Sequence, residues 1–514
     1  MTDTAEVIVV GGGIAGMSFA TQLVDLAGDR ALRIRILSKA AVEVSNSFAA
    51  QGGVAAVMRP EDSFLQHVKD TIMVGGGRND PEVVRLVVRE GPKIIRGLIG
   101  LGARFDADPT GQLALAREGG HSAARVVHHR DHTGEIVRVL RERVRTTKHI
   151  VMVEHERVID LLTEGEGADR QCVGVRTMNL RSGDITDQFA SLVVLATGGA
   201  GQLYEHTTNP RTATGDGVAM AIRAGVTVRD MAFVQFHPTA LCTAEHGPCF
   251  LISEAVRGAG ARLRRPDGGL LMKGLHPMGD LAPRNVVARS IHAELRRTGA
   301  AHVWLDASPI GTTRFAHEFP AIDARCRATG LVPGRDPIPV MPAAHYMCGG
   351  VRTDSRGRTT LPRLLALGEC ASSGLHGADR LASNSLLEAL VIPKRAAEAA
   401  INDLAVLGPE AMRPVRENWL TDRTSSSIIR ASATLRHVMS MHVGIVRDHE
   451  GMEQALRTIA RLERSIAPAW ARRRWSLRLI ELRDLLAVAR SITEAAIAEP
   501  KSIGAHFVKD PAYA

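Results

Sequence analysis

"EVIVVGGGIAG", residues 6–16, is an apolar strand that runs directly into a glycine-rich loop. The apolar stretch Met17–Leu26 has the pattern of a helix, and Leu32–Leu37 that of a second strand. Strand, glycine loop, helix and strand in this order form the context that a dinucleotide-binding fingerprint requires. The stretch therefore predicts a Rossmann-like domain.

The glycine loop is suited to hold a pyrophosphate. Glycines permit a tight turn and a close approach of the backbone to the phosphates, which lie at the N-terminus of the helix. A glycine-rich turn without a ligand is the alternative, but the flanking strands favour a binding site. The residues expected to form this part of the site are Gly11, Gly12, Gly13, Ile14, Ala15 and Gly16.

The second strand does not end in the acidic residue that commonly binds the ribose of NAD. Ser38 and Lys39 occupy that place, and a lysine cannot accept a hydrogen bond from a ribose hydroxyl. This disfavours a standard NAD site and leaves FAD as the open alternative.

Two further strands lead into candidate cofactor loops. Leu192–Ala196 is followed by "TGGAG", and Leu364–Leu367 by Gly368 and Glu369. A helix then opens at "SNSLLE", where Ser385 and Glu388 have capping-box spacing. Capping alone explains the two residues, while the helix N-terminus also offers positive potential to an anionic group.

The cofactor-domain pieces are separated by an insertion, and a helical tail follows them. We expect an α/β + α fold: a Rossmann-like FAD-binding domain interrupted by an α+β capping domain and followed by a C-terminal helical bundle. From about residue 395 onward, apolar residues recur at helical spacing. The expected parts are residues 1–231 and 346–415 for the cofactor domain, 232–345 for the capping domain and 416–514 for the helical domain.

The amino-acid composition of the chain disfavours some classes of function. The 514-residue chain carries a formal charge of +9, which raises the question of a nucleic-acid partner. Basic residues are dispersed, however, and aromatic residues are only 4%, few for base stacking. No apolar run has bilayer-spanning length, the N-terminus lacks a signal-peptide pattern, and the six cysteines form no metal motif. We expect no membrane or nucleic-acid partner, no metal, free thiols and a cytoplasmic location.

Charged residues near the cofactor loops are candidates for chemistry. "FVQFHPTA" contains His237, "LAPRNVVARSI" contains Arg284 and Arg289, "PAAHYMCGG" contains His345, and "GLHGADRL" contains Arg380. Each residue alone would more often be structural. Their common position in glycine- and proline-punctuated stretches indicates one shared site.

Several longer motifs carry a family resemblance: "SNSFAAQGGVAAV", "ATGGAG", "TGDG", "HPTA", "LAPRNVVARSI", "PAAHYMCGG" and "GADRLASNSLLEAL". Together with the first glycine loop, they resemble the fumarate reductase/succinate dehydrogenase flavoprotein superfamily, and within it the L-aspartate oxidases most. The resemblance covers residues 6 to about 395 and continues weakly through the tail, where Lys501 stands in a stretch that departs from the family pattern.

The resemblance implies FAD as the cofactor. Membrane-bound succinate dehydrogenases attach FAD through a histidine just before "AAQGG", but Asn46 occupies the equivalent place here. An amide has no ring nitrogen for that bond, so we expect noncovalent FAD. The remaining residues implied to bind it are Lys39, Asn46, Ser47, Phe48, Ala49, Ala50, Gln51, Gly52, Gly53, Val158, Asp216, Glu369, Ser385 and Leu386.

A single acid interrupts the basic stretch "LAREGGHSAARVVHH", residues 115–129. Taken alone, Glu118 could balance local positive charge beside a glycine turn. The resemblance gives it another role, because the respiratory enzymes carry a neutral loop where this chain has "REGGHS". L-Aspartate differs from succinate by an ammonium group, and Glu118 would bind that group.

The resemblance also implies the remaining roles. Arg284 would be the proton donor and acceptor, while Arg380, Arg284, His237 and His345 would bind the substrate carboxylates. The implied reaction oxidises L-aspartate to iminoaspartate, with oxygen giving hydrogen peroxide or fumarate giving succinate. This is the first step of NAD biosynthesis through quinolinate, and quinolinate synthase is an expected partner. Three rivals stay open: a soluble fumarate reductase, a flavin-binding tRNA-modifying protein and an inactive interaction scaffold.

Overall fold

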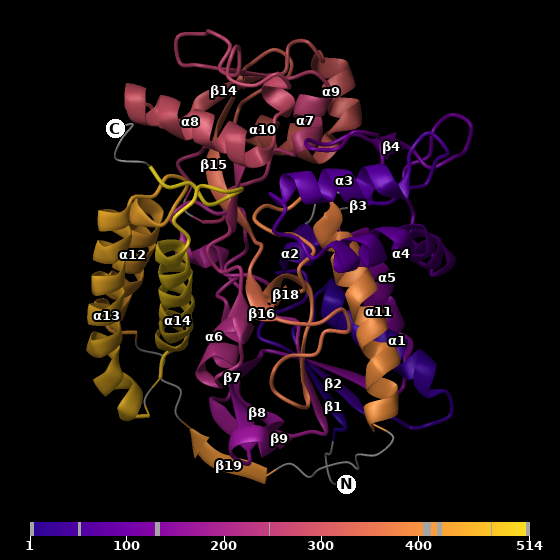
Figure 1. Ribbon diagram of the computed structural model, residues 1–514, viewed down its shortest axis with the longest axis vertical. Coiled ribbons are helices and arrows are strands. Elements are labelled where there is room, and N and C mark those ends of the chain that lie inside the picture. The colour runs from indigo at the N-terminus through magenta and orange to yellow at the C-terminus, as the bar shows by residue number, and fades with distance from the viewer. Residues whose placement is uncertain are drawn as a thin grey trace.

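The fold is built around a five-stranded parallel sheet (Figure 1). The computed structural model describes residues 5–49, 53–128, 134–245, 247–404, 413–418, 424–473 and 475–509. In sheet order, the strands are β17 (Leu364–Ala366), β10 (Leu192–Leu195), β1 (Val7–Val10), β2 (Ile34–Ser38) and β6 (Ile150–Glu154). The strands predicted from the sequence therefore lie side by side, with β1 at the centre.

Alternate side chains of β1 enter two different cores, as the period of a strand dictates. Val7 and Val9 pack with helices on one face of the sheet. Ile8 and Val10 pack on the other face against an antiparallel sheet. The helices are α1 (Ile14–Ala27), α4 (Pro81–Gly100), α5 (Glu135–Thr146) and α11 (Asn384–Leu404); the antiparallel strands are β7 (Glu156–Glu164), β8 (Gln171–Asn179), β9 (Asp184–Phe189) and β19 (Arg413–Asn418).

The segment between β10 and β17 contains a second sheet with a core of its own (Figure 1). Its strand order is β12 (Val234–Leu241), β15 (Ile338–Met347), β14 (Val303–Asp306) and β13 (Arg262–Arg264). The accompanying helices are α7 (Glu254–Gly258), α8 (Arg284–Thr298), α9 (Thr312–Glu318) and α10 (Pro320–Ala328). This α+β part covers the end of the cofactor domain at which the parallel strands finish.

Short elements connect these layers. They include α2 (Asn46–Ala49), α3 (Phe64–Val74), and two small sheets formed by β3 (Val54–Ala55), β5 (Val126–Val127) and β4 (Leu115–Ala116), and by β11 (Val228–Arg229), β16 (Gly350–Arg352) and β18 (Ala371–Ser372). The first of these sheets places the "REGGHS" loop, which follows β4, next to the cofactor domain.

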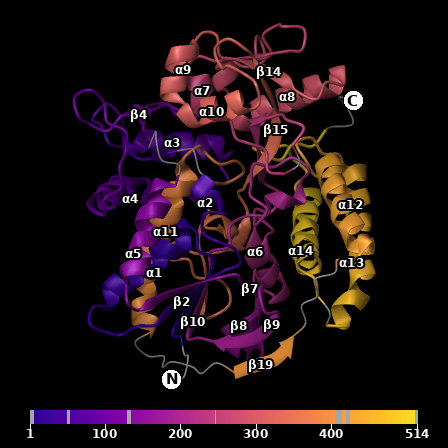
Figure 2. The ribbon, with the colours of Figure 1, turned by 180° about the vertical axis from the view of Figure 1, so that it is seen from behind.

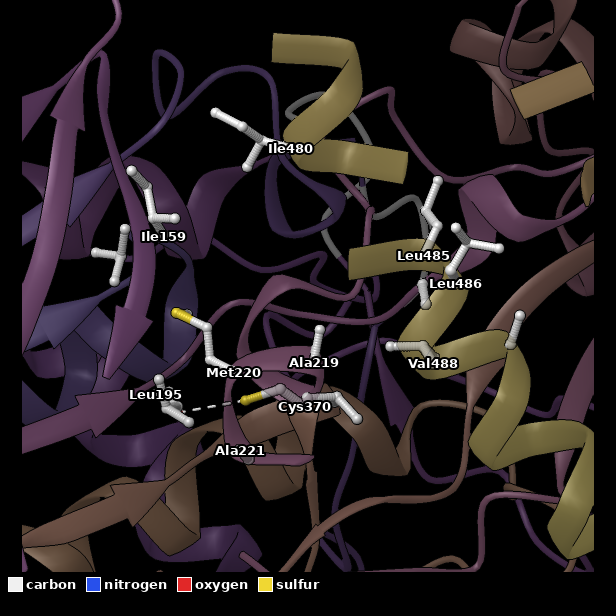
Figure 3. Packing of buried hydrophobic residues seen from close by; sticks show 14 of the residues in the cluster. Ile159, Leu195, Ala219, Met220, Ala221, Cys370, Ile480, Leu485, Leu486 and Val488 are labelled. Atoms are coloured by element: carbon white, nitrogen blue, oxygen red, sulfur yellow. Dashed lines mark hydrogen bonds between the residues drawn. The ribbon is translucent and has the colours of Figure 1, made fainter. Parts of the chain in front are cut away.

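Three C-terminal helices stand beside the cofactor domain (Figure 2). They are α12 (Ser426–His442), α13 (His449–Ala471) and α14 (Leu477–Ala498). Figure 3 shows apolar side chains of α14, among them Leu485 and Val488, beside Ala219 and Met220 of α6 (Asp216–Arg223). The helical part thus shares one core with the cofactor domain.

The predicted fold class is confirmed, with one local correction. The sequence analysis extended helices from about residue 395 onward, but residues 413–418 form strand β19, which pairs antiparallel with β9. The expected domain boundaries stay predictions, and two of them, at residues 345 and 415, fall inside β15 and β19. All six cysteines are free, as expected. None of the helices described combines the length and apolarity that crossing a membrane demands.

Candidate active site

A cavity of about 270 Å³ lies where the parallel strands end against the inserted α+β part. All five residues expected to carry the chemistry line it: Glu118, His237, Arg284, His345 and Arg380. So do most of the residues expected at the cofactor: Gly11, Gly12, Gly13, Ile14, Ala15, Lys39, Asn46, Ser47, Ala49, Gly53, Val158, Asp216, Glu369, Ser385 and Leu386.

Five expected cofactor residues and one candidate arginine are not found among the residues that line the cavity. Gly16 and Phe48 do not line the cavity; the Phe48 ring lies against Gly134 instead. Ala50, Gln51 and Gly52 lie outside the described residues. Arg289 is also not among the lining residues, and its Nη1 donates to the carbonyl of Gly504 in the C-terminal tail (3.2 Å).

The first glycine loop has the geometry that a pyrophosphate needs. Gly11 has φ +114°, and a Cβ there would lie 2.2 Å from the carbonyl oxygen of Ala196. A Cβ on Gly16 would lie 2.2 Å from the carbonyl oxygen of Gly11, so this glycine serves the contact between helix and strand. Helix α1 begins after Gly13, which has no side chain to cap the first N–H groups. An anionic group at this helix end is stabilised by these N–H groups, and the loop therefore fits FAD.

Gln235 holds two arginines of the cavity together. Its Oε1 accepts hydrogen bonds from Nε and Nη2 of Arg380 (3.2 and 3.1 Å) and from Nη1 of Arg284 (3.1 Å). The amide is oriented because its Nε2 donates to Asp379 and to the carbonyl of Arg380 (2.8 Å). Two like charges thus converge on one amide oxygen, which creates a strong preference for an anion between them.

Hydrogen bonds hold the Arg380 guanidinium in place, but they do not use all of its N–H groups within the described residues. Nη1 donates to Oγ of Ser385 (2.5 Å), and the group lies over the Tyr346 ring, 4.5 Å from its centroid. Of its five N–H groups, three are used in these hydrogen bonds of the described residues, which leaves one on each Nη for a carboxylate. Burial and the nearby positive charge of Arg284 lower the pKa of Arg380.

A second acid, Glu254, pairs with arginines. Its Oε2 accepts from Nε of Arg284 (2.7 Å) and its Oε1 from Nη2 of Arg257 (3.1 Å). Burial raises the pKa of Glu254, but the two guanidinium groups outweigh burial and hold the pKa below its ordinary value. The charge of Glu254 is therefore already compensated within the protein.

The two histidines act as neutral hydrogen-bonding groups. Burial, together with the neighbouring arginines, lowers the pKa of His237 and of His345 well below the ordinary value. The backbone N–H of Thr239 donates to Nδ1 of His237 (3.3 Å), so the ring proton lies on Nε2. The positive charge of the site comes from the arginines, and not, as the sequence analysis allowed, from the histidines as well.

Glu118 is compensated differently from Glu254. Oγ of Ser383 donates to its Oε2 (2.7 Å), and Nε2 of His128 lies 3.4 Å from its Oε1. Burial raises the pKa of Glu118, but His128, Arg284 and Ser383 together bring it down to about 2. Within the described residues, no arginine or lysine nitrogen lies within 4 Å of this carboxylate. Glu118 is therefore an ionised group that can still take a cationic partner.

Of the two interpretations left open for Ser385 and Glu388, the capping box is not formed by their side chains. Helix α11 begins at Asn384, and Ser385 receives the Arg380 hydrogen bond described above. Glu388 accepts from Ser373 Oγ and pairs with His376 (3.0 Å) inside the protein. Ser385 and Glu388 have the spacing of a cap, but both side chains bind buried residues of another loop instead.

Three residues of the site were missed by sequence reasoning. Gln235 lies in the quoted motif "FVQFHPTA" and Glu254 lies outside the quoted motifs. Neither was singled out, because an amide and a helix-starting acid are common structural residues. Ser383 adopts φ +64°, an uncommon conformation for a serine, and this turn directs its hydroxyl to Glu118. No local sequence signal indicates that contact, which joins residues 265 positions apart.

Known proteins are similar to this chain over its whole length. The family described as FAD binding domain matches residues 6–386, and fumarate reductase flavoprotein C-term matches residues 432–513. L-aspartate oxidase 1 of Ralstonia nicotianae is 42% identical over 98% of this chain and 95% of its own length. The chain belongs to the L-aspartate oxidase family. Its cofactor is FAD, and it is an FAD-dependent oxidoreductase.

Further members and solved structures agree with that family. L-aspartate oxidase of Streptomyces coelicolor is 41% identical over 99% of this chain and 89% of its own length. Among solved structures, an E. coli quinol fumarate reductase is 30% identical, with a TM-score of 0.88 over 99% of this chain and 91% of that one. This chain thus shares its architecture with a quinol fumarate reductase, as the motifs indicated.

Proposed function

We propose that the protein oxidises L-aspartate to iminoaspartate, with FAD bound along the glycine loop. The observation that carries the proposal is the ionised Glu118 in the same cavity as Arg284 and Arg380. A dicarboxylate with one ammonium group is complementary to this arrangement, because Arg284 and Arg380 suit the carboxylates and Glu118 suits the ammonium. Succinate and fumarate would satisfy only the arginines.

The side chains divide the work by their chemistry. Arg380 offers its two remaining Nη N–H groups to one carboxylate, while Arg284 and the neutral His237 and His345 donate hydrogen bonds at the other end. The inserted α+β part covers the site and keeps water from the reacting carbon. The chemistry that FAD supplies when bound is acceptance of a hydride from C2 of the substrate, with reoxidation by oxygen or fumarate.

Arg284 is the proposed proton donor when fumarate is reduced. It can exchange a proton only if a neighbour stabilises its neutral form or returns the proton, since a free guanidinium has a pKa above about 12. Glu254 is hydrogen-bonded to both Arg284 and Arg257 and could return that proton. The contacts of Glu254 support this role for Arg284.

The function is tested by mixing the oxidised protein with candidate substrates without oxygen. L-Aspartate should bleach the flavin absorption band fastest, and D-aspartate, succinate and L-glutamate should bleach it far more slowly. Succinate lacks the ammonium that Glu118 would bind, D-aspartate has the opposite configuration at C2, and L-glutamate is one methylene longer. Subsequent admission of oxygen should restore the band and form hydrogen peroxide. Bleaching by succinate but not by L-aspartate would instead identify a soluble fumarate reductase.

The FAD is proposed to be noncovalent, because Asn46 offers no ring nitrogen at the cavity wall. Denaturation with acid or heat should release the entire yellow chromophore into the supernatant. The precipitated chain should be colourless and free of flavin fluorescence. Flavin that stays with the precipitate would contradict the proposal.

The location and the protein partner belong to the same proposal. A cytoplasmic location is supported by six free cysteines, which persist in a reducing compartment. The family also contains chloroplastic enzymes, for example in Arabidopsis thaliana. Iminoaspartate is a reactive product, and we propose quinolinate synthase, which would consume it, as the partner.

A further inference from the structure

One end of the cofactor cavity is connected to the C-terminal helices by buried charges. Asp484, at 1% exposure, lies on α14 where this helix packs on α6. Figure 3 shows the apolar surroundings of this helix contact, with Val488 of α14 beside Ala219 of α6. A carboxylate in such a place is stable only if cations compensate it.

Three hydrogen bonds connect Asp484 with Asp216 and Lys39 at the cavity wall. Nη2 of Arg157 donates to Oδ2 of Asp484 (2.8 Å) and also to Oδ1 of Asp216 (3.2 Å). Oδ2 of Asp216 in turn accepts from Nζ of Lys39 (2.6 Å). Asp216 and Lys39 line the cavity, whereas no described residue of α12, α13 or α14 does. Within the described hydrogen bonds, Arg157 links Asp484 of the helical part to these two cavity-lining residues.

The position of Arg157 depends on both carboxylates. Its side chain is fully buried, and the next acidic oxygen, on Glu481, is 3.8 Å away from its Nη1. Asp484 also accepts from Nη1 of Arg223 (2.8 Å), so its charge compensates two cations. If Asp484 lost its charge, Arg157 would be drawn toward Asp216, the carboxylate that also binds Lys39.

We propose that Asp484 is a positioning residue for FAD: it holds Arg157 between two carboxylates and so keeps Asp216 and Lys39 in place for the adenosine half of the cofactor. Lys39 follows β2, and this strand end lies beside the adenosine ribose in Rossmann-like domains. The coupling is reciprocal, so FAD binding strengthens the docking of α14 onto α6.

The test is Asp484→Asn, which keeps the shape of the side chain and removes its charge. FAD is titrated into the apoprotein and binding is followed by flavin fluorescence. The dissociation constant should rise about tenfold or more. The L-aspartate KM of the FAD-saturated variant should stay within about twofold, because Asp484 does not line the cavity and its described hydrogen bonds are to Arg157 and Arg223. In the wild type, FAD should slow amide exchange in α14, and it should do so less in the variant.

Asp160→Asn is the matched control. Asp160 accepts from Nε of Arg223 (2.7 Å) and Nη1 of Arg483 (2.9 Å), but it does not contact Arg157 in the described hydrogen bonds. Its loss removes a charge from the same cluster without releasing Arg157, so FAD affinity should stay within about twofold of the wild type.

A purely structural role for Asp484 predicts a different result. The melting temperatures of the apo and FAD-bound forms would then fall equally, and the FAD dissociation constant would not change; this outcome would overturn the proposal. If Asp484→Asn does not fold, Asp484→Glu gives the same test, because it moves the charge by one methylene. A raised dissociation constant supports the proposal, and an unchanged one contradicts it. The measurement reads FAD binding alone and is independent of which substrate is oxidised.

Discussion

Arg380→Leu should retain FAD and lose both L-aspartate oxidation and fumarate reduction. The variant removes the two Nη N–H groups that are free to bind a carboxylate, and both substrates carry that group. Loss of one partner of a buried charged pair costs at least about 2 kcal/mol, so kcat/KM should fall roughly 30-fold or more for each substrate. Steady-state kinetics of both reactions, with the flavin content measured in the same preparation, check this result.

Arg289→Leu is the control for that variant. Arg289 lies on α8, the helix that begins with Arg284, but it contacts Gly504 in the tail and does not line the cavity. The same change of residue type should leave both activities within about threefold of the wild type, as is usual for a group outside the site. Full activity of Arg380→Leu, or equal losses in both variants, would remove Arg380 from the substrate site.

Glu118→Gln should separate the two activities. The glutamine keeps the size and hydrogen-bonding capacity of the side chain but cannot balance the substrate ammonium. An ion pair in a closed site supports about 2–5 kcal/mol, so kcat/KM for L-aspartate should drop roughly 30-fold or more. Fumarate has no ammonium group, and its reduction with an artificial electron donor should fall by less than about threefold. The quantity to report is the ratio of the two activities.

The expected drop in kcat/KM reports the removal of a negative charge, because the wild-type Glu118 is not protonated under the assay conditions. With a pKa of about 2, Glu118 is ionised at every pH at which the ratio would be measured, and its charge would be lost only near that pH. Glu135→Gln is a matched control, because Glu135 is equally buried but pairs with Arg138 on α5, away from the cavity. Parallel losses of both activities in Glu118→Gln would assign Glu118 a structural or catalytic role instead of one in substrate choice.

The sequence was sufficient for the cofactor domain because its signals are local. The strand before Gly11, the glycines and the periodic helix after them lie within a few turns of chain, and β1 and α1 form where that pattern places them. Strand β19 was not predicted because its pairing partner, β9, lies far away in the chain. Strand propensity depends on such neighbours more than on the residues themselves.

The candidate site shows the same limit at the level of single side chains. Motifs identified Arg380 and His237 as residue types suited to the chemistry. They did not reveal that Gln235 connects the two arginines or that Glu254 already has two cationic partners. The charge of Glu254 is compensated by arginines, whereas the charge of Glu118 is available to a ligand. This difference arises only when the separate segments fold together.

The contact between Ser383 and Glu118, across 265 positions of chain, has a consequence for synthesis. The glycine loop leaves the ribosome early, but β17 and the start of α11 emerge only after the whole insertion has been made. Until then the parallel sheet lacks its β17 edge, and the acid that is to receive the ammonium lacks its hydroxyl partner. Such long-range pairings form slowly, so the site can be completed only after α11 has been synthesised. A premature stop before α11 would yield a protein without a complete site.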